Sequence, residues 1–417
     1  MEMPAHQVPR KRAILPYYLA AVISLLLISA LTLLSVGDFR GHFFQPHILA
    51  ITHLTVFGWA TMVIMGASNQ LIPVIADKKL YSENLPLLSF LLITLGTCLL
   101  VHAFWVFELG AMIFTGAGLI LTALIIHVAN IILTTRKATP AIAVDFMVTA
   151  HLWLIVTASI GLFLLLNFRF GLLPENHLHY LRIHASIGMA GWFLLLVIGV
   201  SSRLVPMFLL SRKEVRKYLT AAYYLINIGL VLLLAEGMIF QTANGLLIDV
   251  TLVIGGLAFY LVYLYHCYRS AIRKKMDAGM KMTTIAIAAI ALPFMLLMAA
   301  LFWVKETPVN IVSAYGYAFF AGFITILIMG QTFKTLPFII WTHLNKPDKI
   351  ADLQPRDLYS EKLVKIQLYP YLTGFLLFLT GILLRSQWLM YPGSALMTTA
   401  ALLYAGHVFY IINKLRK

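Results

Sequence analysis

The sequence contains little charge: only 11% of its residues are Asp, Glu, Lys or Arg, and 61% are hydrophobic. A soluble globular domain has about a quarter of its residues charged, so this composition excludes that class. Two cysteines in 417 residues, Cys98 and Cys267, are too few for a disulfide framework or a cysteine-based metal site. No glycine-rich phosphate loop or other nucleotide motif is present. The composition therefore favours an integral membrane protein.

Apolar runs of roughly twenty residues recur along the whole chain, and each is long enough to cross about 30 Å of hydrocarbon. There are twelve, at about 14–36, 46–76, 86–107, 109–134, 142–167, 178–210, 218–241, 246–270, 283–304, 311–338, 363–384 and 388–413. We therefore predict an all-α integral membrane protein with twelve transmembrane helices, forming a single polytopic membrane domain over residues 1–417.

Basic residues predict the orientation of these helices. If the N-terminus is cytoplasmic, only Arg40, Arg169, Arg182, Lys305 and Arg385 of the 31 Lys and Arg lie on the outer side. This positive-inside bias predicts that both termini are cytoplasmic, in a bacterial-type inner membrane. The net charge of +15 needs no nucleic acid to explain it, because no basic stripe with interleaved aromatics is present. The expected partner is membrane lipid.

Three stretches share one spacing of two glycines eight residues apart, followed by a proline seven residues later. They are Gly58–Gly66–Pro73, Gly191–Gly199–Pro206 and Gly322–Gly330–Pro337, at intervals of 133 (191 − 58) and 131 (322 − 191) residues. A repeat this long indicates that one helix bundle has been used three times. We predict three pseudo-equivalent four-helix repeats, about 14–134, 142–270 and 283–413, with the helices at 46–76, 178–210 and 311–338 facing the interior.

Two of the thirteen histidines lie at matching positions in this repeat. His53 and His184 stand five and seven residues before Gly58 and Gly191, so their depths differ by about 3 Å at 1.5 Å per residue. Two imidazoles at one level can bind a metal, or a haem iron from both sides. Gly58 and Gly188, about one turn further in, remove side-chain bulk where a porphyrin face would lie.

A third histidine, His151, falls near the middle of the fifth helix, where an ionisable group is costly and tends to be functional. It is a candidate metal ligand or relay. His127 falls toward the cytoplasmic side, and we expect no function for it. For each histidine, hydrogen-bonded packing or anchoring at the interface remains the alternative interpretation.

The segment from His53 to Pro73 resembles the second helix of the haem-copper oxidase catalytic subunit, a family that includes the nitric oxide reductases. It is also similar to the NnrS-type haem and copper membrane proteins. The resemblance implies twelve helices in three arcs, a b-type haem bound by His53, and copper as a further possible cofactor. The chain departs from that family on helices 218–241 and 311–338, which have no histidine; Tyr315 and Tyr317 occupy the outer level of the latter.

These observations predict a haem-binding membrane protein with a reduced ligand set, which transfers electrons or handles a diatomic gas such as NO or O2. As an enzyme it would be a divergent oxidoreductase, with an electron-donor protein or a quinol as its partner. The haem propionates would lie toward the outer surface near Arg182. Two alternatives remain open: a small-solute or ion transporter or channel using Gln70, Arg203, Lys334 and His151, and a cofactor-free structural membrane subunit.

Overall fold

The computed structural model describes residues 9–240, 246–273, 275–302, 308–344 and 354–416; Lys305, assigned above to the outer side, lies outside them. Within these ranges every regular element is a helix, apart from one isolated β-bridge between Ser211 and Ala271. Twelve helices of this described part are long and apolar enough to cross a membrane. The predictions of an all-helical, multi-pass membrane protein with twelve candidate spans are confirmed.

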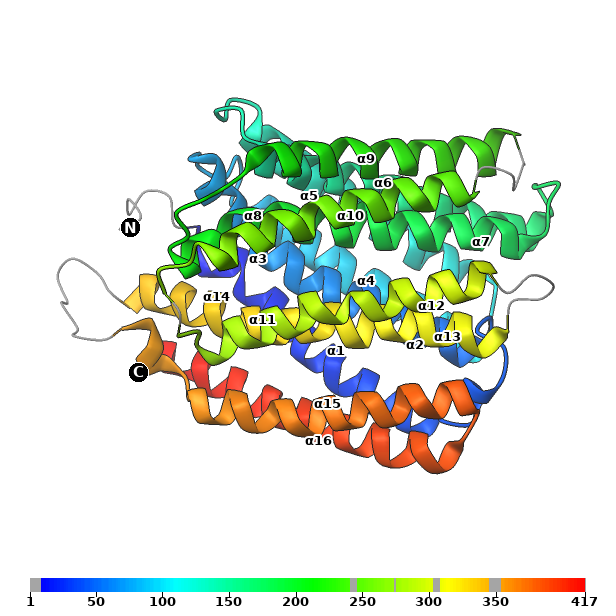
Figure 1. The fold of residues 1–417 in the computed structure, drawn as a ribbon. Helices are drawn as coiled ribbons and strands as arrows, with labels where there is room; N and C mark the ends of the chain where they lie inside the picture. The colour runs from blue at the N-terminus through cyan, green and yellow to red at the C-terminus, as the bar shows by residue number, and fades with distance from the viewer. Residues whose placement is uncertain (1–8, 241–245, 274, 303–307, 345–353, 417) are drawn as a thin grey trace. The chain divides into compact units, whose positions relative to one another are not determined.

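Several of the spans contain more than one helical segment (Figure 1). In chain order the segments are α1 (Leu15–Leu34), α2 (Pro46–His53), η4 (Leu54–Thr61), α3 (Met62–Ala76), α4 (Leu85–Val106), α5 (Ala111–Thr135), α6 (Ile142–Phe170), α7 (His177–Ser186), η5 (Ile187–Leu194), α8 (Leu195–Leu209), α9 (Arg216–Ala235), η6 (Glu236–Phe240), α10 (Leu246–Arg269), α11 (Ala278–Ala289), α12 (Ala291–Phe302), α13 (Val309–Tyr317), η7 (Ala318–Thr325), α14 (Ile326–Leu344), α15 (Glu361–Leu384) and α16 (Gln387–Asn413).

Most span limits differ from the predicted ones by three residues or fewer, and two ends differ by five or six residues for identifiable reasons. The ninth begins at Ala278 rather than 283, because the Asp277 side chain accepts a hydrogen bond from the backbone N–H of Met280 at 3.0 Å and caps the helix. The tenth continues to Leu344 rather than ending near 338. It passes through Pro337, since a membrane helix tolerates the loss of one backbone hydrogen bond where neighbouring groups compensate.

The chain divides into two compact units. Unit 1 consists of residues 1–9, 68–96 and 114–275, and unit 2 of residues 10–67, 97–113 and 276–417. Unit 1 therefore contains most of α5 together with α6 to α10. Unit 2 contains α1, α2, η4 and all helices from α11 onward.

Unit 1 is packed through glycines that bring helices close together. The neighbouring helices α9 and α10 form a hairpin, coloured green in Figure 1, in which a Cβ on Gly229 would lie 2.8 Å from the carbonyl oxygen of Asp249. On α8, a Cβ on Gly199 would lie 2.9 Å from Cβ of Phe146 on α6. Such distances leave no room for a larger residue without separating the helices.

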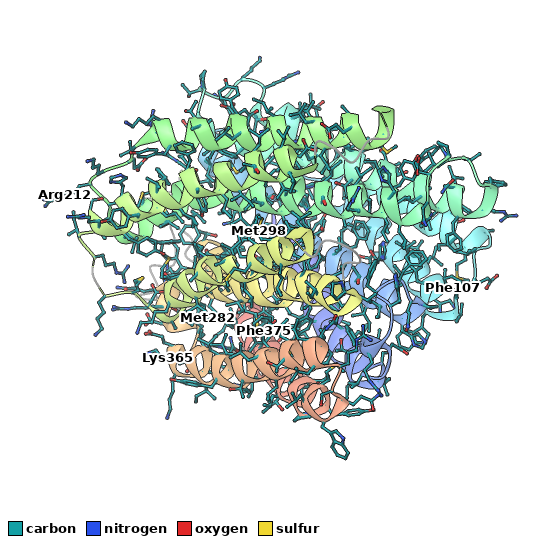
Figure 2. All side chains as sticks on the ribbon, turned by 45° about the vertical axis from the view of Figure 1, so that its right-hand side comes forward. Phe107, Arg212, Met282, Met298, Lys365 and Phe375 are labelled. Carbon is teal, nitrogen blue, oxygen red and sulfur yellow. The ribbon has the colours of Figure 1, made fainter. Side chains whose placement is uncertain are left out.

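Unit 2 is also packed through glycines at close contacts between helices. The helices α15 and α16 run side by side (Figure 1), and a Cβ on Gly374 would lie 2.6 Å from the carbonyl oxygen of Gly393. Met282 of α11 and Phe375 of α15, both labelled in Figure 2, fill space beside two glycines of the tenth span. A Cβ on Gly330 would lie 2.8 Å from Met282, and one on Gly322 would lie 2.7 Å from Phe375.

Three spans contain a π-helical stretch of eight residues: η4, η5 and η7. Their starts are 133 (187 − 54) and 131 (318 − 187) residues apart, which are the intervals between the glycine motifs. Gly58, Gly191 and Gly322 are each the fifth residue of their stretch. π-helical turns are rare and are often found at functional sites. The residues around these stretches are therefore candidates for a functional site.

Candidate cofactor site

His53 is the last residue of α2, directly before the π-helical stretch η4. Its Nδ1–H donates a hydrogen bond to the backbone carbonyl of Leu49, one turn earlier, at 2.7 Å. Its ring stacks on Phe104 of α4, with centroids 4.6 Å apart, and the residue is half-buried. Because Nδ1 carries the proton, Nε2 carries the lone pair, and Nε2 has no hydrogen-bond partner among the described residues. This is the arrangement in which a histidine is ready to bind a metal ion.

His184 lies two residues before the end of α7, in unit 1, and is held by the neighbouring helix α6. Its Nδ1–H donates to the backbone carbonyl of Thr157 at 3.0 Å. The ring lies over Gly161, where a Cβ would stand only 2.9 Å from Cε1 of the imidazole. As in His53, the proton on Nδ1 places the lone pair on Nε2. Gly161 was not recognised as part of the site from the sequence.

His151 is fully buried on α6, and its Nδ1–H donates to the carbonyl of Met147 at 2.7 Å. Its Nε2 is buried without a hydrogen-bond partner. The ring contacts the edge of Trp192 in η5 at a centroid distance of 5.0 Å and lies 5.3 Å from the ring of His127 on α5. His127, for which no function was expected from the sequence, is therefore a close and equally buried neighbour of His151.

Gly58 and Gly188 pack against neighbouring side chains. A Cβ on Gly58 would lie 2.7 Å from Oγ of Ser24 on α1, and one on Gly188 would lie 3.0 Å from Cγ2 of Thr157 on α6. Close helix packing thus accounts for both glycines. The Cβ of a larger residue at either position would meet a neighbouring helix. That the two glycines make room for a porphyrin stays a prediction.

Arg182 is exposed on α7 and donates from Nη2 to Nδ1 of His179 at 3.4 Å. The other ring nitrogen of His179 donates to the carbonyl of Gly237 at 3.1 Å, so the chain of hydrogen bonds joins α7 to η6. This hydrogen bond holds the guanidinium within the first two turns of the sixth span.

Tyr317 ends α13 directly before η7, as His53 ends α2 before η4. Its hydroxyl donates to Sδ of Met397 at 2.9 Å, and its ring stacks on Phe378 with centroids 4.9 Å apart. Tyr317 thus has packing partners on both α15 and α16. Tyr315, the other tyrosine at this level, is half-buried.

Among the residues that the structure describes, no group of three or more His, Cys, Asp or Glu side chains is arranged to hold a metal ion. The candidate donors are thus single histidines and one histidine pair. Comparison with known proteins gives no matching family model and no matching curated protein. The function must be argued from the residues themselves.

Proposed function

We propose that this chain is a multi-pass membrane protein that binds a b-type haem through His53 and His184 and uses it for electron transfer or for handling NO or O2. One observation carries the proposal: in both residues Nδ1–H donates to a backbone carbonyl, of Leu49 and Thr157 respectively. Histidines that bind metals are typically oriented in this way, because the hydrogen bond selects the tautomer with a lone pair on Nε2. The donor chemistry fits an axial haem ligand.

The assignment of both histidines to one haem rests on their shared register in the sequence. They precede Gly58 and Gly191, each the fifth residue of a π-helical stretch. The nearly equal spacing of η4, η5 and η7 supports a threefold repeat of four helices, about 14–134, 142–270 and 283–413. The charge distribution supports cytoplasmic termini and a bacterial-type inner membrane.

When bound, a haem supplies one-electron chemistry and an iron atom that a diatomic gas can reach. The chain's own residues determine which use dominates. His53 and His184 would both hold the haem through Nε2, and because a gas would compete with these two ligands, this favours electron transfer. Phe104 orients the His53 ring by stacking, and Arg182 is placed to meet a carboxylate at the end of its span. The resemblance to oxidases extends the proposal to an oxidoreductase supplied by an electron-donor protein or a quinol.

The test is the visible absorption spectrum of the purified full-length protein. We expect a Soret band, a b-type pyridine haemochrome, and loss of the band in His53→Ala and His184→Ala. His343→Ala is the matched control: His343 is also half-buried, and its Nδ1 donates to the carbonyl of Ile339 one turn earlier at 2.8 Å. It lies at the opposite end of its span from the π-helical stretch, so its replacement should leave the band unchanged.

Size-exclusion chromatography and circular dichroism of each variant separate loss of haem from loss of folding. A colourless wild-type protein, after expression with added haem precursor, would overturn the proposal and leave a transporter, a channel or a structural subunit. Loss of the band in His343→Ala to the same extent as in His53→Ala would also overturn it, because the effect would then be general.

A further inference from the structure

The deepest histidines of unit 1 form a pair. His127 stands eight residues before the end of α5 (135 − 127), and His151 stands nine residues after the start of α6 (151 − 142). At about 1.5 Å per residue, both lie roughly 12–14 Å along their helices from the same connection. Their rings are 5.3 Å apart at an interplanar angle of 39°, and their exposed fractions are 1% and 0%.

Three of the four ring nitrogens in this pair have no hydrogen-bond partner in the described part of the chain: both of His127 and Nε2 of His151. Buried polar atoms are almost always partnered, so each exception requires an explanation. The hydrogen bond to Met147 fixes the His151 ring with its lone pair on Nε2. Among the described residues no hydrogen bond is made by the ring of His127, so none fixes which of its nitrogens carries the lone pair.

We infer that His127 and His151 together bind one copper(I) ion inside unit 1. The inference is independent of the haem proposal, which concerns other histidines. Neutral imidazole nitrogens are good ligands for copper. Metal–imidazole bonds are about 2 Å long, so two rings on one ion in the linear geometry that two-coordinate copper(I) prefers have centroids roughly 6 Å apart. The observed 5.3 Å is shorter by less than about 1 Å, so a small separation of the two rings would admit the ion.

The donor set selects a monovalent ion with few ligands. Zinc takes four ligands in structural sites and three protein ligands in catalytic ones, and non-haem iron takes two histidines with a carboxylate. The described residues offer no such group. Transfer of an ion into a low-dielectric interior is costly, and this cost rises with the square of its charge. Copper(I) needs only two ligands and carries one charge, so two neutral imidazoles suffice.

The test uses the full-length protein, purified without oxygen and titrated with copper(I) against the chelator bicinchoninate. We expect one ion per chain in the wild type and affinity at least about tenfold weaker in His127→Leu and His151→Leu. His102→Leu is the control, since His102 is exposed on α4, and it should bind as the wild type does. His127→Cys should retain binding, because a thiolate is also a ligand for copper(I).

X-ray absorption at the copper edge should show imidazole ligands in the wild type and an added sulfur ligand in His127→Cys. A pair that merely shares a water molecule or a direct hydrogen bond would take up no copper, which overturns the inference. Uptake that is equal in wild type and His127→Leu, or a Cys variant as weak as the Leu variant, would also overturn it. The Cys variant and the wild-type spectrum decide the matter even if a Leu variant fails to fold. The visible band, measured on the same samples, reports on haem separately.

Discussion

Gly161→Ala should weaken haem binding without destabilising the fold. A Cβ on Gly161 would stand 2.9 Å from Cε1 and 3.4 Å from Nδ1 of His184. Carbon atoms pack comfortably at about 3.5–4.0 Å, so the imidazole must move by roughly 0.6 Å or more. A shift of this size along the bond between Nδ1 and the Thr157 carbonyl would lengthen it from 3.0 Å to as much as about 3.6 Å, beyond hydrogen-bonding distance.

Two opposing terms then leave the stability nearly unchanged. Loss of the hydrogen bond costs about 0.5–1.5 kcal/mol, while replacing a helical glycine by alanine gains about 0.5–1 kcal/mol. The free energy of unfolding should therefore change by less than about 1 kcal/mol. The orientation of the His184 ring is lost all the same, and removal of such a supporting group typically weakens metal binding by about 10–100-fold.

The assay measures haem retention, as the ratio of Soret to protein absorbance on dilution, together with thermal unfolding of the haem-free protein. Gly118→Ala on α5 is the control in the same unit, because a Cβ there meets no atom within 4 Å. It should retain haem as the wild type does. Retention equal to wild type in Gly161→Ala would refute the reasoning, because the His184 ring would then not depend on the space above this glycine.

Two further predictions concern the packing of unit 2. Gly393→Ala should be less stable than Gly406→Ala on the same helix by about 1–3 kcal/mol when unfolded in detergent. A Cβ on Gly393 would stand 2.7 Å from the backbone nitrogen of Phe378, whereas one on Gly406 meets nothing within 4 Å. Equal stabilities would contradict the close contact of α15 with α16. Lys334→Met and Asp277→Asn should each lower the free energy of unfolding by up to about 3–5 kcal/mol, because the side chains of this ion pair are only 12% and 17% exposed. The double variant should recover part of this loss. Strictly additive effects would show that the pair is not coupled.

The twelve spans could be predicted because a membrane helix requires an unbroken apolar run, which is visible in any window of the sequence. Their ends were less predictable. The start of α11 depends on the cap that Asp277 provides, and α14 continues past a proline that usually ends a helix. Both depend on partners that lie outside the apolar run.

The π-helical stretches and the position of His127 beside His151 were not predicted from the apolar runs of the sequence. A π-helical turn is a change in backbone hydrogen bonding that follows from packing and has no residue signature of its own, although Gly58, Gly191 and Gly322 each lie in one such stretch. His127 was judged from its depth on one helix alone. Counting residues from the connection between α5 and α6 would have placed it beside His151, since antiparallel neighbours bring such positions to one level.

The three π-helical stretches share a backbone but not the residue that precedes them, which is His53, Ser186 or Tyr317. The hydroxyl of Tyr317 donates a hydrogen bond to Met397. In the stretch that follows Ser186, the histidine, His184, lies two residues before this serine. The recurrence of these stretches therefore does not imply a repeated ligand set. The two proposed haem ligands also differ in what holds them: His53 is fixed by a carbonyl of its own helix, whereas His184 is fixed by a carbonyl of α6. The His184 ring should consequently respond to any change in how α6 packs on α7, while the His53 ring should remain in place.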